Sequence, residues 1–182
     1  GWRLDLEQEF VYVGDAGVVE PGGRTLRHGV DASVRWQAMP WLFIDGDYTW
    51  TRARTSDAPE GAFYIPLAPV HTAAGGITVQ KNDFSGSLRA RWLGDRPANE
   101  DYSLTAKGYL VIDAQLNYSP TLAKGRRPLE WTLSITNLAN TAWKETQFET
   151  TSRLRDEAEP VTEIHFTPGA PFWLKSGITF KF

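Results

Sequence analysis

The sequence predicts an all-β protein built around one antiparallel sheet. Apolar and polar residues alternate along most of the chain with a period of two, which is typical of strands, and helical periodicity is nearly absent. Connectors between the alternating runs fall into a short set and a long set. These observations predict eight strands, at residues 2–13, 29–38, 41–54, 72–80, 84–95, 109–119, 129–144 and 172–182.

One face of every predicted strand is apolar, and the other carries the charge. The apolar set begins with Trp2, Leu4, Leu6, Phe10, Tyr12, Val30, Val34 and Trp36, and ends with Leu174, Ile178, Phe180 and Phe182. The charged set comprises Arg3, Asp5, Glu7, Glu9, Asp31, Arg35, Asp45, Asp47, Arg89, Arg91, Asp113, Glu130, Lys175 and Lys181. Because a slip of one residue would exchange the two faces, this pattern specifies the register strongly.

Composition excludes several other classes of protein. The 182 residues suffice for one domain, and a net charge of -3 gives no basic bias toward nucleic acid. The absence of cysteine excludes a disulfide framework and a thiolate metal site. No apolar run reaches the roughly 18 residues of a transmembrane helix, but a spanning strand needs only about 9–11 residues with every second one apolar.

The lengths and positions of the connectors distinguish a membrane barrel from a soluble sheet. Short connectors at 38–40, 81–83 and 120–128 alternate with long ones at about 14–28, 55–71, 96–108 and 145–171. Membrane barrels have short turns at one end and long loops at the other, whereas a soluble sandwich has no reason to sort its loops by side. The sequence therefore favours a transmembrane β-barrel over a soluble sandwich.

Aromatic residues gather at both ends of the apolar face, as expected at two membrane interfaces. Near the short turns these are Trp2, Trp36, Phe84, Tyr118, Trp131 and Phe180, and near the long loops they are Phe10, Tyr12, Tyr48, Trp50, Trp92 and Phe172. Aromatic richness is also common in ordinary strands, which is the alternative explanation. The last strand keeps its alternation to a terminal Phe182, although the ends of soluble domains tend to fray.

Four ordered segments carry a resemblance to a known family. Residues 14–31 end in Arg-His-Gly-Val-Asp, residues 66–73 read Pro-Leu-Ala-Pro-Val-His-Thr-Ala, residues 136–140 read Thr-Asn-Leu-Ala-Asn, and residues 166–171 read Phe-Thr-Pro-Gly-Ala-Pro. Each segment resembles a stretch of the TonB-dependent receptors, with Asp31 where that family usually has Glu. The resemblance spans nearly the whole chain.

The resemblance implies a 22-stranded outer-membrane barrel with a plugged lumen, of which residues 1–182 would be the C-terminal portion, about eight strands without the plug domain. The whole protein would bind a scarce nutrient such as a ferric siderophore and import it with energy passed through TonB. It would be a transporter of the Gram-negative outer membrane, with no enzyme activity and no cofactor. The ending Ile178, Phe180 and Phe182 would be the signal read by the outer-membrane assembly machinery.

The long loops are the expected place for ligand contacts, because binding residues favour loops on a rigid scaffold. Arg153 and Arg155 are expected to grip a carboxylate or phosphate, and Tyr102 and Trp143 to stack on an aromatic or sugar ligand. A solvated charged loop is the alternative for the segment 145–171. For residues 137–140, a bulge or bend in the strand is expected, with ligand contact as the alternative.

No catalytic or metal-binding motif is present in the sequence. The three histidines His28, His71 and His165 lack metal-ligand spacing, and the pair Asp45 and Asp47 fits a hydrated, ion-paired wall better than general acid–base catalysis. Two other readings stay open at this point. One is a small standalone outer-membrane barrel, and the other is a soluble β domain that binds a lipid or sugar.

Overall fold

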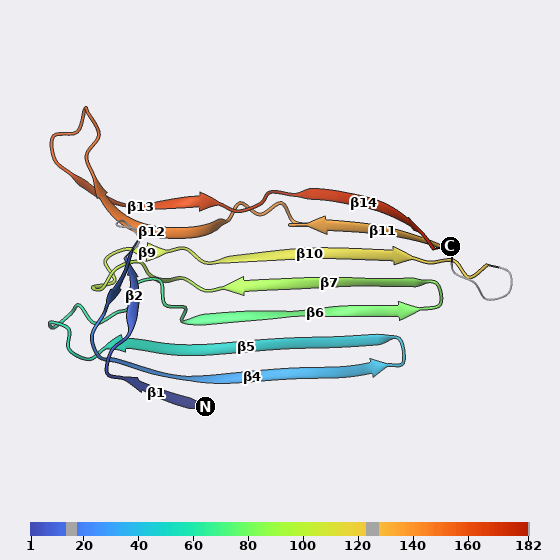
Figure 1. Cartoon of the computed structure of the whole chain (residues 1–182), viewed down its shortest axis with the longest axis horizontal. Coiled ribbons are helices and arrows are strands. Elements are labelled where there is room, and N and C mark those ends of the chain that lie inside the picture. Colours follow the sequence, from blue (N-terminus) through green and yellow to red (C-terminus); the bar gives the residue numbers. More distant parts are fainter. Residues whose placement is uncertain (14–17, 123–127, 182) are drawn as a thin grey trace.

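The computed structural model describes residues 1–13, 18–122 and 128–181. Residues 14–17 of the first resembling segment, 123–127 of the predicted connector 120–128, and Phe182 lie outside the described residues. The centre of the fold is an eight-stranded antiparallel sheet in the order β1-β4-β5-β6-β7-β10-β11-β14 (Figure 1). These strands are β1 (Trp2–Leu6), β4 (Thr25–Met39), β5 (Leu42–Thr55), β6 (His71–Lys81), β7 (Phe84–Leu93), β10 (Tyr109–Tyr118), β11 (Leu129–Thr136) and β14 (Trp173–Phe180). The predicted all-β antiparallel sheet is confirmed.

The two ends of the sheet differ, as the connector lengths predict. Tight connections join β4 to β5 and β6 to β7 at one end (Figure 1). At the opposite end, three of the four long connectors contribute hairpins: β2 (Phe10–Val13) with β3 (Val18–Pro21), β8 (Arg96–Pro97) with β9 (Thr105–Ala106), and β12 (Lys144–Ser152) with β13 (Val161–Pro168). The connector at 55–71 forms no hairpin. We call this second end the loop end.

Cross-strand register confirms the two predicted faces from β4 to β14. At the centre of β7, Leu88 lies opposite Ile77 and Ala114, whereas its neighbour Arg89 lies opposite Gly76 and Asp113. Residues directly opposite each other share a face, so the apolar set and the charged set stay separate across these strands.

The first strand is an exception, and the predicted faces of its residues are wrong. Trp2 lies opposite Gly29 and Leu4 opposite Arg27, which places both side chains on the charged face, and Arg3 and Asp5 therefore lie on the apolar face. Trp2 covers Gly29 so closely that a Cβ there would lie 2.8 Å from the indole ring. The space above Gly29 is what admits the indole on this face.

Two predicted strands, 2–13 and 129–144, are each divided in the structure. The first ends at Leu6 because the backbone of Glu9 bonds to Gly22 and Gly23, while its carboxylate is held by Arg27. The second ends at Thr136, where Asn137 takes a left-handed conformation with φ of 52°. The predicted break at residues 137–140 is therefore confirmed, but it ends the strand instead of bulging it.

Ion pairs tie neighbouring strands together on the charged face. Arg35 pairs with Asp47 at 2.8 Å, Arg91 with Asp113 at 3.2 Å, and Lys181 with Glu130 at 2.7 Å. Arg89 reaches past β6 to Asp45, at 2.8 Å, and Gly76 is the β6 residue opposite both of them. These half-exposed pairs form the hydrated, ion-paired wall that the sequence predicts for Asp45 and Asp47.

The sheet is open in the described part of the chain, where β1 and β14 are its two edges. Its apolar face is uncovered, and the exposed side chains include Val30, Trp36, Leu88, Leu116, Ile178 and Phe180. The described residues form no helix, so none is long and apolar enough to cross a membrane.

Candidate ligand-contact sites at the loop end

Asn137 fastens the loop end of β11 to two other segments. Its side-chain oxygen accepts a hydrogen bond from the Thr141 backbone, and its amide nitrogen donates to the carbonyls of Thr141 and Ala170. The Asn137 backbone N–H donates to the Asp113 carboxylate on β10 at 2.9 Å. With a fully buried side chain, Asn137 uses its whole amide within the protein, which fits the structural reading of residues 137–140.

Trp143, one of the predicted ligand residues, lies on the charged side of the sheet beside Tyr109 and Arg91. The Trp143 and Tyr109 ring centroids are 4.7 Å apart, and the Arg91 guanidinium carbon lies 6.0 Å from the indole. The indole N–H donates to the Ala170 carbonyl at 3.0 Å, which fixes the ring over Gly169. Two aromatic rings and a cation at the loop end can stack on a planar anionic group.

The β12–β13 hairpin is attached to the sheet by Gln147. Its side-chain oxygen accepts from the Lys107 N–H at 3.0 Å, and its amide donates to the Lys107 carbonyl at 2.7 Å. This side chain is buried and imitates the hydrogen bonds of a neighbouring strand. Two residues along, burial raises the pKa of the Glu149 carboxyl above its usual value, and the nearby Glu100 raises it further.

Hairpin docking should therefore depend on pH. An acid whose pKa is raised in the docked state favours docking below its ordinary pKa, and this contribution is lost as pH rises through the raised value. Between roughly pH 4 and 8, we expect hydrogen exchange of the β12 amides, corrected for intrinsic rates, to lose protection as pH rises. Glu149→Gln should remove most of that dependence, and Glu145→Gln, an exposed acid of the same strand, should leave it in place. Identical profiles for all three proteins would contradict this role for Glu149.

Tyr102 lies in a different place from Trp143. It takes a left-handed conformation with φ of 59°, and its ring meets Tyr64 edge-on at 5.2 Å. Both tyrosines line a hollow between the end of β5 and the segments around residues 64–71 and 95–102. Arg54 points into this neighbourhood, with its guanidinium carbon 4.1 Å from the Phe63 centroid.

Arg153 and Arg155 lie at the tip of the β12–β13 hairpin. Arg153 donates to the Glu157 carbonyl at 3.0 Å, and both side chains are exposed. The length of β12 separates them from Trp143 by roughly 26 Å at the ordinary rise of a strand. The structure thus divides the four predicted ligand residues among three locations.

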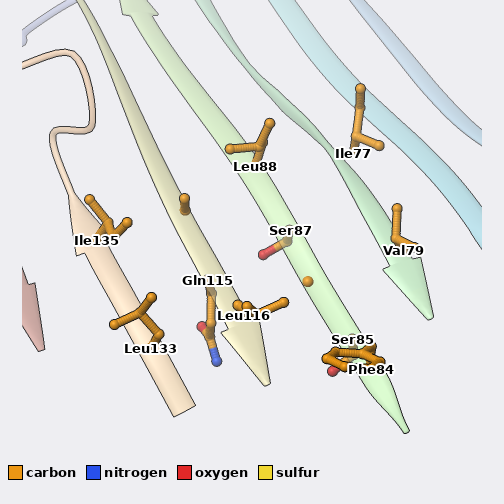
Figure 2. A pocket seen from close by; sticks show the side chains of 12 residues that line it. Ile77, Val79, Phe84, Ser85, Ser87, Leu88, Gln115, Leu116, Leu133 and Ile135 are labelled. Atoms are coloured by element: carbon orange, nitrogen blue, oxygen red, sulfur yellow. The ribbon is translucent and has the colours of Figure 1, made fainter. Parts of the chain in front are cut away.

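A hollow among apolar side chains carries no chemistry of its own. It lies on the apolar face, where Gly86 and Ala114 leave space among longer side chains, and Figure 2 shows Ile77, Leu88, Leu116, Leu133 and Ile135 around it. Its lining has no charged residue. Among the described residues, no three His, Asp or Glu side chains gather in a way that could hold a metal ion.

Two members of these clusters, Arg91 and Tyr109, were not predicted as ligand residues from the sequence. Both belong to strands with ordinary alternation, so the pattern marks them as wall residues of the charged face. Their proximity to Trp143 depends on how the chain returns after Asn137, which no local pattern specifies. Ile178 and Phe180, the predicted assembly signal, lie on the apolar face and are 61% and 64% exposed.

An antiparallel sheet with one apolar face, one ion-paired face, tight turns at one end and hairpins at the other defines a section of a transmembrane β-barrel. The profile of the family described as "TonB dependent receptor-like, beta-barrel" matches residues 1–138. The chain belongs to this family, whose members are receptors and transporters of the Gram-negative outer membrane.

Solved structures of such receptors have the same fold. The ferric-catecholate import receptor Fiu of E. coli K12 has a TM-score of 0.66 and 23% identity over 97% of this chain. The siderophore receptor PiuA of Acinetobacter baumannii matches 99% of the chain with a TM-score of 0.66 and 13% identity, and the copper transporter OprC matches 99% with 0.66 and 14%. The chain spans 24%, 25% and 28% of these three proteins, so it corresponds to a partial barrel. Among curated proteins, none matches the chain.

Proposed function

We propose that this chain is the C-terminal barrel section of an outer-membrane receptor that imports a scarce nutrient, such as a ferric siderophore, using energy delivered by TonB. The observation that carries the proposal is the two-faced sheet with its hairpins at one end, in a chain of the TonB-dependent receptor family. In this role the apolar face meets lipid, and the ion-paired face lines the lumen. The hairpins of the loop end would face the outside of the cell.

The open sheet supports a larger barrel. Backbone N–H and C=O groups at a strand edge cannot stay unpaired in lipid, so β1 and β14 need partner strands. Eight strands would enclose a lumen filled by side chains, whereas the charged wall from Arg35 to Lys181 suits a wider lumen around a polar plug. We infer that further strands and a plug domain, which carries the contact with TonB, complete the functional receptor.

The ligand contacts that we propose are of two kinds. Arg153 and Arg155, exposed at the hairpin tip, would make the first contact with an anionic ligand in solution. Trp143, held over Tyr109 and Arg91 on the lumen side, would stack on that ligand once it has entered. Tyr102 lines a separate hollow, and its predicted ligand contact remains a prediction. On the last strand, Ile178 and Phe180 would also form part of the signal that the outer-membrane assembly machinery reads.

Replacing Trp143 with alanine should weaken ligand binding by the complete receptor roughly tenfold or more, because a half-buried aromatic ring near the centre of an interface commonly contributes at least that much. Equilibrium binding of the transported ligand to the full-length protein checks this. Trp36→Ala is the matched control, since Trp36 is exposed on the apolar face at the short-turn end. Equal affinities of wild type and both variants would contradict the proposed contact.

Transport itself is tested by uptake in cells with and without TonB. Uptake that needs both the full-length receptor and TonB would support the function. Retention of uptake without TonB, or recovery of the receptor in the soluble fraction, would contradict it and favour a standalone barrel or a soluble β domain.

A further inference from the structure

The hollow beside Tyr102 at the loop end includes side chains from the apolar face of the sheet. It is lined by the end of β5 and by the segments around residues 64–71 and 95–102. On β5, Arg52 and Arg54 continue the alternation of Tyr48 and Trp50, and the cross-strand partners of Trp50 are Val30 and His71. Arg52 and Arg54 therefore lie on the face that, under the proposed function, meets lipid.

Aromatic rings in and beside this hollow mark the level of the membrane interface under the proposed function. The His71 ring lies between those of Tyr48 and Trp92, with 6.1 Å between ring centroids on each side. Its Nδ1 and the Tyr48 hydroxyl share a hydrogen bond of 2.8 Å. Trp50 meets His28 edge-on at 5.8 Å. Such rings sit at the headgroup level of membranes. Arg52 and Arg54, two and four residues after Trp50 on β5, therefore lie at or just above the headgroups.

The charge around the hollow is positive and in large part unpaired. Arg52 is exposed and makes no hydrogen bond or ion pair within the described part of the chain. It lies directly opposite His28, which in turn lies opposite Arg3, so three basic side chains form one row across β5, β4 and β1. Asp5, which follows this row on β1 opposite Leu26, is held by two hydrogen bonds from Arg24.

Within the hollow, Arg54 also has a hydrogen-bond donor that a ligand could use. The Arg54 guanidinium stacks on Phe63, and its Nε is buried without a hydrogen-bond partner. The one acid of the lining, Asp95, already accepts bonds from the Gly108 N–H at 2.7 Å and the Lys107 ammonium at 3.0 Å. Among the residues that the structure describes, no carboxylate group therefore neutralises Arg52 or Arg54.

From this geometry we propose that the hollow binds the phosphate of a lipid headgroup in the outward-facing leaflet, with Arg52 as its main contact and Arg54 and His28 beside it. Guanidinium groups bind phosphate through paired, charge-assisted hydrogen bonds. An arginine on the lipid side of a barrel is costly at mid-membrane and nearly neutral at the interface, where a phosphate can satisfy it. This inference rests on the proposed function, because it requires the apolar face to meet a membrane.

The test uses the full-length receptor in detergent and compares two lipids with identical acyl chains. Phosphatidic acid carries a phosphate monoester, and phosphatidylcholine is zwitterionic. By native mass spectrometry, phosphatidic acid should bind roughly tenfold more tightly, and Arg52→Gln should remove roughly that preference. Lys175→Gln makes the same change of charge on the opposite face of the sheet, where Lys175 lies across from Ser134. This variant should leave the preference intact.

Three results would overturn the inference: equal binding of the two lipids, equal loss in the two variants, or displacement of phosphatidic acid by millimolar inorganic phosphate alone. Uptake of the transported ligand by the same proteins separates this inference from the proposed function. A receptor that imports its ligand but shows no lipid preference contradicts only the lipid site. A receptor that is absent from the outer membrane contradicts the proposed function.

Discussion

Replacing Asn137 with alanine should lower the unfolding free energy of the receptor's barrel by about 3–5 kcal/mol. The substitution removes three side-chain hydrogen bonds at a fully buried position and leaves the N–H and the carbonyl of Thr141 without these partners. Each buried polar group left unsatisfied costs about 1–3 kcal/mol. Alanine also fits the left-handed conformation, with φ of 52°, less well than asparagine.

Asn140→Ala is the matched control for this variant. Asn140 has a similar φ of 49°, but it accepts one side-chain bond, from the Phe172 N–H, at an exposed position. We expect a loss of about 1 kcal/mol for Asn140→Ala. Denaturant unfolding of the full-length protein in detergent measures both. Equal losses for Asn137→Ala and Asn140→Ala would show that the Asn137 network does not hold the end of β11.

Placing arginine at Leu88 should cost about 2–4 kcal/mol, the typical penalty for a cation on the lipid side of a barrel near mid-membrane. Leu88 is at the middle of β7 on the apolar face, 48% exposed, opposite Ile77 and Ala114. The unfolding free energy of the full-length receptor in lipid bilayers, measured over a series of denaturant concentrations, gives the loss. The reason is desolvation of the guanidinium, which finds no acid among these neighbours.

Ser87→Arg is the matched control, because it adds the same charge at the residue next to Leu88. Ser87 lies on the opposite face, between Thr78 and Gln115, and under the proposed function this face lines the hydrated lumen. We expect a change within about 0.5 kcal/mol. A penalty at Ser87 as large as that at Leu88 would mean that both faces of β7 are shielded from water, which would contradict a charged face that lines a hydrated lumen.

Alternation in the sequence predicts most of the sheet because a strand's period is the same wherever the strand is placed. From β4 to β14, that period alone predicts that Leu88 and Ile77 share the apolar face and that Arg35 and Asp45 share the charged face, as the register shows. The pattern fails at β1, where Trp2 covers Gly29 on the charged face. The contact depends on a glycine, which has no side chain, on the neighbouring strand β4. The alternation within β1 alone does not predict it.

The ligand-contact residues were harder to predict than the sheet. Residue type identified Trp143 as a stacking group, but its partners Tyr109 and Arg91 come from strands more than thirty residues earlier. Arg153 and Arg155 form no common site with Trp143, because the whole of β12 separates them. Loop residues are placed by tertiary contacts such as the Gln147 bonds to Lys107, which periodicity does not encode.

The most direct test of a two-faced membrane barrel is a scan of single cysteines along β7, from Phe84 to Leu93, in the full-length receptor in bilayers. The chain itself has no cysteine, so it adds no background label within this section. With a fluorescent label at each position, Leu88, Ala90 and Trp92 should be quenched by a lipid-bound quencher, and Ser87, Arg89 and Arg91 by a water-soluble one. Quenching from water at both sets of positions would contradict the account, because it would place neither face of the sheet against lipid.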